Sequence, residues 1–73
     1  MVKVLKKVDE ILRLISEAPE TIMFSELEAR TAINKATLAH ILKSLVQLGY
    51  VEKPAKGRYR IGPVLLELAD SRL

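Results

Sequence analysis

Apolar residues recur at helical spacing in two long segments of this 73-residue chain. In residues 4–18 they form one stripe among charged residues, which predicts an amphipathic helix. Pro19 would end this helix, because proline lacks the amide that a helix requires. In residues 35–48 a second stripe follows Asn34, a good helix cap, and precedes Gly49, which can close a helix in left-handed geometry. The pattern therefore predicts two well-specified helices over 4–18 and 35–48.

A shorter helix is expected between these two. Thr21–Phe24 is short and apolar and favours a single short strand. Ser25 can then cap a helix over residues 25–31, since its hydroxyl would accept a hydrogen bond from a first-turn amide, and Glu28 would complete a capping box. Two helices joined by a tight turn, the second longer and polar on its outward face, are typical of a helix-turn-helix, whose second helix enters the major groove of DNA.

The last third of the chain predicts a hairpin and a final helix. Residues 50–61 hold two segments of alternating polarity around a run of turn-forming residues, which indicates a β-hairpin. In its second strand Tyr59 would face the core while the arginines on either side face outward. A basic hairpin after a helix-turn-helix is a wing. Pro63 then begins an unusually apolar helix over 63–72, since proline is well tolerated in a first turn.

The composition fits one small globular domain. The chain is 49% hydrophobic and 29% charged, which excludes a disordered or collagen-like protein. It has no Cys, and therefore neither a disulfide framework nor a thiolate metal site, and its amino terminus lacks the apolar run of a signal peptide or membrane span. We expect a cytoplasmic protein without cofactor. The expected fold class is mainly α (α+β), a single-domain (1–73) three-helix winged helix-turn-helix with a β-hairpin wing and a C-terminal linker helix.

The charge is concentrated where this fold would meet DNA. The net charge is +3, but residues 35–60 hold six basic side chains and one acidic one. Such a cluster is typical of a polyanion-binding surface, although a solvated charged face is the alternative interpretation. Its position on the second helix of the motif and on the wing favours sequence-specific binding of double-stranded DNA.

The candidate contacts follow from this geometry. The amino end of the helix after Asn34 would bring free amides toward phosphates, and Lys35 and Lys43 would neutralise them. Thr37 and His40 are short and outward enough to reach phosphates or base edges. The wing cations would hold the backbone or the minor groove. The full set of candidate DNA-binding residues is Ser25, Asn34, Lys35, Ala36, Thr37, His40, Lys43, Lys56, Arg58 and Arg60.

Most of the chain resembles the DNA-binding domain of the IclR family of transcriptional regulators. The residues that carry the resemblance are Val8-Asp9, Ile11-Leu12, Ala18-Pro19-Glu20, Ser25-Glu26-Leu27, Lys35, Thr37, Leu48-Gly49-Tyr50-Val51-Glu52, Gly57-Arg58-Tyr59-Arg60-Ile61-Gly62-Pro63 and Leu65-Leu66-Glu67-Leu68. The resemblance implies a winged-helix dimer on palindromic operators, usually joined through a linker helix to a separate domain that senses a small-molecule effector. The chain departs from the family pattern at Ala32, Ala36 and Ala39-His40.

A homodimer is expected because one domain of this size buries too little DNA surface for strong specificity. The apolar last helix, through Leu65, Leu66 and Leu68, and the first helix could form its interface, although the last helix could instead pack onto the first. The alternative function is a winged helix that binds protein. An enzyme is not expected, since the chain has one His, no Cys and no glycine-rich phosphate loop. The operator, the effector, the sign of regulation and the natural length stay open.

Overall fold

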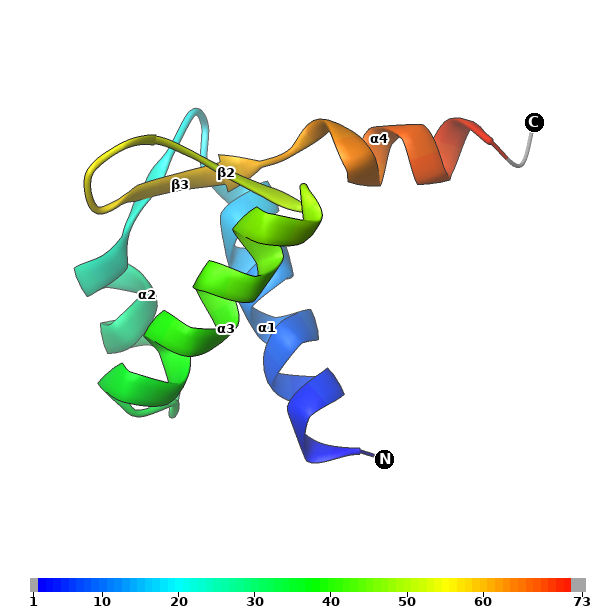
Figure 1. Ribbon diagram of the computed structural model, residues 1–73. Coiled ribbons are helices and arrows are strands. Elements are labelled where there is room, and N and C mark those ends of the chain that lie inside the picture. The colour runs from blue at the N-terminus through cyan, green and yellow to red at the C-terminus, as the bar shows by residue number, and fades with distance from the viewer. Residues whose placement is uncertain (1, 72–73) are drawn as a thin grey trace.

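The computed structural model describes residues 2–71 of the chain. Its elements, in order, are α1 (Lys3–Glu17), β1 (Ile22–Met23), α2 (Phe24–Arg30), α3 (Lys35–Leu48), β2 (Val51–Ala55), β3 (Arg58–Ile61) and α4 (Pro63–Asp70). Helices α1, α2 and α3 lie together under a small sheet, and α4 extends away from them (Figure 1). This arrangement confirms the expected fold class, a three-helix winged helix-turn-helix with a hairpin wing and a further C-terminal helix. No helix among residues 2–71 is both long and apolar enough to cross a membrane.

The core is built almost entirely from aliphatic side chains. Ile11 of α1, Leu27 of α2 and Leu38 of α3 are fully buried and bring the three helices together. Val51 and Tyr59 extend this core into the sheet. Since none of the described residues buries a polar or charged side chain in the core, its stability depends on apolar contact alone.

The wing is the larger part of a three-stranded antiparallel sheet with the strand order β1-β3-β2. In the hairpin Glu52 pairs with Arg60 and Ala55 pairs with Arg58, so β2 has one residue more than β3 between these pairs. Pro54, which we expected in the turn, lies in this irregular stretch of β2. A proline fits there because a bulge leaves one backbone amide out of the ladder. The turn is therefore only Lys56-Gly57.

The expected cap of α2 is wrong. The helix begins at Phe24 with Met23 as its N-cap, no side chain caps it, and Ser25 is an exposed residue inside its first turn. The physical reason is a tertiary hydrogen bond: the amide of Phe24 donates to the carbonyl of Gly57 at 2.8 Å. Because the wing accepts this amide, the helix can start directly after β1 without a hydroxyl cap.

The caps expected for α3 are both present, and its bounds are those expected. The side-chain oxygen of Asn34 accepts from the amide of Thr37 at 2.9 Å. Gly49 ends the helix in left-handed geometry with φ 82°, and its amide donates to carbonyls of the last turn. A Cβ at Gly49 would also lie only 2.6 Å from a methyl group of Val64. Gly49 therefore meets two requirements, one of backbone angle and one of space.

Gly49→Ala should lower the free energy of unfolding by about 2 kcal/mol. An alanine there would carry left-handed backbone strain of about 1 to 2 kcal/mol and would also displace the side chain of Val64. Gly57→Ala is the matched control, since Gly57 has φ 73° and a Cβ there would meet no atom within 4 Å. We expect it to cost about 1 kcal/mol. Urea unfolding of both variants measures the difference, and equal losses would show that the Val64 contact has no energetic weight.

Helix α4 is joined to the end of α3 rather than to α1. The amide of Gly62 donates to the carbonyl of Tyr50 at 2.9 Å, and the amide of Val64 donates to that of Gly49 at 3.3 Å. No residue of α4 is buried, and the helix projects away from α1 (Figure 1). The expected span of 63–72 ends instead at Asp70, and residue 72 lies outside the described residues. Its apolar side chains are therefore left to form a surface.

Candidate nucleic-acid interface

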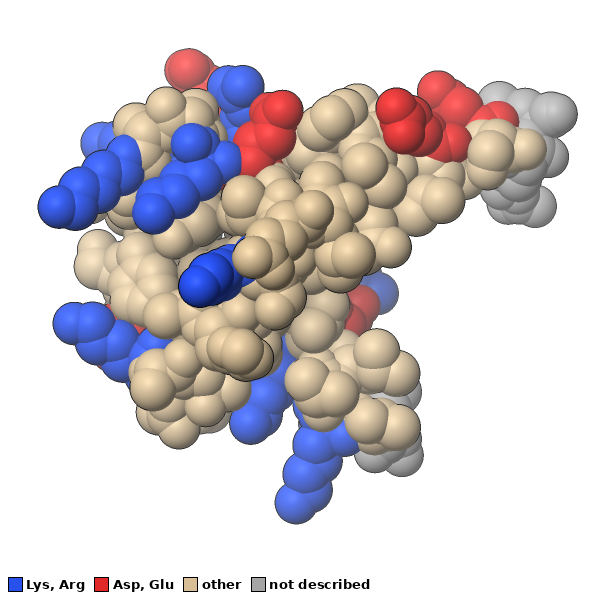
Figure 2. All heavy atoms as spheres, viewed as in Figure 1, with Lys and Arg blue, Asp and Glu red and all other residues tan. Residues whose placement is uncertain are grey.

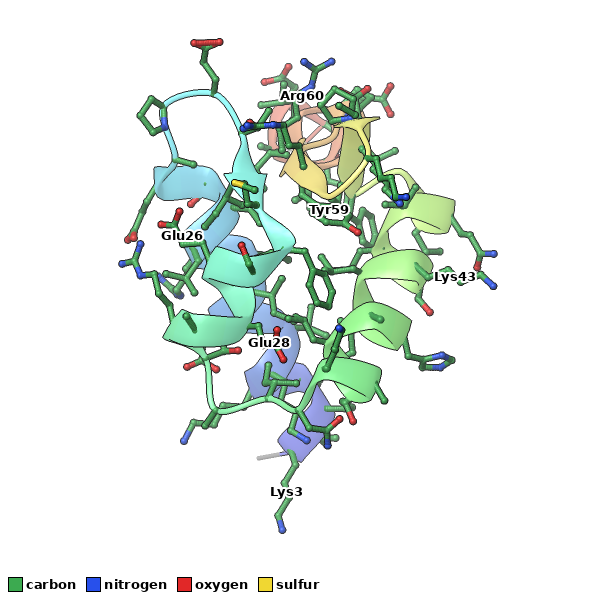
Figure 3. All side chains as sticks on the ribbon, turned by 90° about the vertical axis from the view of Figure 1, so that its left-hand side faces the viewer. Lys3, Glu26, Glu28, Lys43, Tyr59 and Arg60 are labelled. Atoms are coloured by element: carbon green, nitrogen blue, oxygen red, sulfur yellow. The ribbon has the colours of Figure 1, made fainter. Side chains whose placement is uncertain are left out.

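The outward face of α3 presents most of the residues proposed for the major groove. Lys35, Ala36, His40 and Lys43 are exposed, and Thr37 is half-buried. Because the buried stripe of the helix contacts the core, these side chains point to solvent along the opposite face. Lys43 projects from the middle of the helix, away from α2 (Figure 3).

Asn34 has a structural role at the start of this helix. Its side-chain oxygen is engaged with the Thr37 amide, so it holds the first turn. The amides of Lys35 and Ala36 precede that bond and stay free in the first turn, where helices favour anions. Ser25 lies in the first turn of α2, exposed and without a hydrogen-bond partner among the described residues. The exposed Asn34 therefore keeps only its side-chain NH2 group for DNA, whereas the hydroxyl of Ser25 is free as donor and acceptor.

The three candidate cations of the wing differ in position: one lies in the turn and two lie on β3. Lys56 lies in the turn, whereas Arg58 and Arg60 lie on the face of the sheet opposite to the buried Tyr59. Arg58 Nη1 donates to Thr21 Oγ1 at 3.3 Å, and Arg60 Nε donates to Glu52 Oε1 at 2.9 Å. Figure 3 shows Arg60 above the hairpin and Tyr59 below it, toward α3. Glu52 therefore offsets part of the charge that we expected from Arg60.

A cleft between α3 and β2 adds residues that our candidate set lacks. It has a volume of about 490 Å³ and is lined by Ala39, Leu42, Lys43, Val46, Gln47, Lys53 and Tyr59. The Lys53 ammonium lies 5.9 Å from the centroid of the Tyr59 ring, within cation–π range. Lys53 is one of the wing cations expected from the sequence to hold the DNA backbone, and its strand position places it on the same face as Val51.

The cations on this side of the molecule are mostly free of acidic partners. Lys35, Lys43, Lys53 and Lys56 form no ion pair with any described residue, whereas Arg13, Arg30 and Arg60 each pair with an acid. Figure 2 shows blue side chains over the hairpin and α3, and red ones on α4. No three His, Asp or Glu side chains within residues 2–71 are grouped as metal ligands would be. The surface is suited to a polyanion.

Comparison with known proteins gives a consistent result. Residues 4–55 match the family model of the IclR helix-turn-helix domain. The chain is 36% identical over 70 residues to the glycerol operon regulatory protein of Streptomyces griseus, a match that covers 94% of this chain and 28% of that protein.

Two solved structures are similar over almost the whole chain. The repressor BlcR of Agobacterium tumefaciens superposes with a TM-score of 0.86 and 27% identity, covering 97% of this chain and 29% of that one. An IclR family transcriptional regulator from Brucella abortus superposes with a TM-score of 0.84 and 27% identity, covering 99% of this chain and 28% of that one. The chain thus spans less than a third of the length of these relatives.

Proposed function

Because the chain belongs to the IclR family of DNA-binding transcriptional regulators, we propose that it binds one half-site of a duplex operator in a sequence-specific manner. The amino-terminal half of α3 lies in the major groove in this proposal, and the β2–β3 hairpin follows the adjacent backbone or minor groove. Thr37 and His40 are the residues proposed to contact base edges. Phosphates are proposed to be contacted by Lys35, Lys43, Lys53 and Lys56.

One observation carries this proposal: four lysines without acidic partners among the described residues lie on α3 and the hairpin that follows it. Exposed lysines of this kind can exchange counterions for phosphates at little cost, since no internal ion pair must be broken first. The two arginines of β3 already have protein partners and would lose those contacts on reaching DNA. We therefore assign the phosphate contacts mainly to lysine.

The test is selection of binding sites from random duplex DNA, followed by affinity measurements over a range of salt concentrations. Each phosphate neutralised contributes about 0.9 to the slope of log affinity against log salt, so four lysines predict a slope of about −3 to −4 per domain. An enriched sequence and a slope of this size would support the proposal. Affinity that neither selects a sequence nor depends on salt would contradict it.

We further propose that two copies associate through the groove between α1, α3 and α4. The groove has a volume of about 540 Å³ and is lined mainly by apolar side chains, among them Val4, Val8, Leu48, Leu65 and Leu68, while His40 and Ser44 form a polar edge on α3. Leu48 and Leu68 are 59% and 54% exposed, which is unusual for leucine in a solvated monomer. Leu66, proposed with them from the sequence, is exposed but does not line the groove. A second copy of the same helices would cover these surfaces, as expected for a protein that reads an inverted repeat.

Leu68→Ala should weaken this self-association about tenfold or more, since it removes apolar surface that the partner would bury. Sedimentation equilibrium at several concentrations measures the dimer constant. Met23→Ala is the control, because Met23 is 47% exposed but lies on β1, away from the groove. A chain that stays monomeric at all concentrations, or equal effects of the two variants, would exclude this interface.

A further inference from the structure

The cleft between α3 and β2 lies where the two DNA-contacting elements meet. Lys43 and Gln47 come from the outward side of α3, Lys53 comes from the hairpin, and Leu42 and Val46 form an apolar floor. We propose that this cleft holds one sugar-phosphate unit of the DNA backbone, with Lys43, Lys53 and Tyr59 as donors to the phosphate. The inference rests on the DNA-binding function proposed above and names the residues that join its two parts.

Tyr59 adds an aromatic ring and a hydroxyl to a cleft that otherwise has two lysines. Its side chain is only 8% exposed because the ring is part of the core, yet it also lines the cleft. The Tyr59 hydroxyl has no hydrogen-bond partner among the described residues. Every fully buried side-chain nitrogen or oxygen of these residues does have a partner. The hydroxyl oxygen is therefore not fully buried, and because Tyr59 lines the cleft, we infer that this unused donor faces it.

The charges around the cleft select an anion. Lys43 and Lys53 approach from opposite sides, and none of the lining residues is acidic. The cation–π contact over the Tyr59 ring holds the Lys53 ammonium at the mouth of the cleft, so less side-chain freedom is lost when it binds. The only acid of the hairpin, Glu52, is engaged with Arg60.

The shape of the cleft suits a nucleotide unit better than a free ion. A volume of about 490 Å³ exceeds that of a phosphate group, and its floor is formed by Ala39, Leu42 and Val46. Deoxyribose carbons can lie on this floor while the phosphate oxygens face the two ammonium groups and the phenol. In this proposal, the strand that leaves the major groove beside α3 and passes under the wing crosses this position between the helix and the hairpin.

Tyr59→Phe is the sharpest test, since it removes one oxygen and leaves the ring in the core. We expect about tenfold weaker binding to the selected duplex, the usual loss for a hydrogen bond to a charged group. Ser16→Ala is the control, because it also removes one hydroxyl, and Ser16 is exposed on α1 and lines neither the cleft nor the groove next to α4. Lys53→Gln should reduce the salt slope by about 0.9. The urea midpoint of each variant establishes that the fold is intact.

The phosphate itself is identified by making single linkages of the duplex neutral with methylphosphonate. At one linkage per half-site, neutralisation should weaken the unmodified protein about tenfold but have little further effect on a Lys53→Gln/Tyr59→Phe double variant. If the protein binds the duplex and no linkage shows this coupling, the cleft assignment fails while the proposed function stands. If the protein does not bind duplex DNA at all, both fail together.

Discussion

Lys43→Glu should weaken binding to the selected duplex about 100-fold at 0.1 M salt. At this concentration one phosphate contact contributes roughly a factor of ten to affinity, and reversing the charge adds repulsion of similar size. Lys43 is exposed, has no acidic partner among the described residues, and lies on both the outward face of α3 and the wall of the cleft. Among the residues proposed to contact DNA, only Lys43 belongs to both regions.

The control for this substitution is Lys3→Glu, which makes the same change of net charge at the far end of α1 (Figure 3). Titration of labelled duplex by fluorescence anisotropy measures both variants. We expect Lys3→Glu to change affinity less than threefold at the same salt, because Lys3 lies at the start of α1 and lines neither the outward face of α3 nor the cleft. Equal losses in the two variants would mean that total charge, and not the α3 surface, governs binding.

Leu38→Ala should lower the free energy of unfolding by about 3 kcal/mol. Leu38 is fully buried where α3 meets α1 and α2, and truncation of such a leucine costs about 2 to 5 kcal/mol through lost transfer energy and a residual cavity. A 73-residue domain has a total stability of roughly 4 to 11 kcal/mol, so a large share would be lost. DNA binding should weaken in parallel on warming, as the unfolded fraction rises.

Leu5→Ala is the matched control, since Leu5 is 59% exposed on α1 and its truncation should cost less than about 0.5 kcal/mol. Urea unfolding at a protein concentration low enough to keep the chain monomeric compares the two. A loss below about 1 kcal/mol for Leu38→Ala would show that the three helices do not depend on this contact.

The helices were predictable wherever their signals are local. The bounds of α3 follow from its apolar stripe and from two caps, Asn34 and Gly49, that are adjacent to it in sequence. The start of α2 was not predictable in this way, because the group that accepts its first amide is the carbonyl of Gly57, more than thirty residues later. A capping rule considers only neighbours along the chain, and Ser25 satisfies it without being used.

In the candidate site, too, some features follow from local sequence patterns and others depend on contacts with distant residues. The exposure of Lys35, His40 and Lys43 follows from helical periodicity alone. The state of Arg60 depends on the hairpin register that places it opposite Glu52, and a bulge near Pro54 changes that register along the strand. The alternation of polarity predicts that Tyr59 faces the core, where its ring does lie. No such pattern could reveal that Tyr59 also lines a cleft formed with α3.

Gly49 and Gly62 connect the end of α3 and the start of α4 through direct backbone contact. A Cβ on Gly62 would meet the carbonyl oxygen of Gly49. The backbone at the start of α4 therefore contacts the backbone after α3 with no side chain between them. Two backbone hydrogen bonds hold the start of α4 to the two residues that directly follow α3. A side chain at Gly62 would have to push the start of α4 away from the end of α3, so the direction in which α4 leaves the domain depends on this glycine.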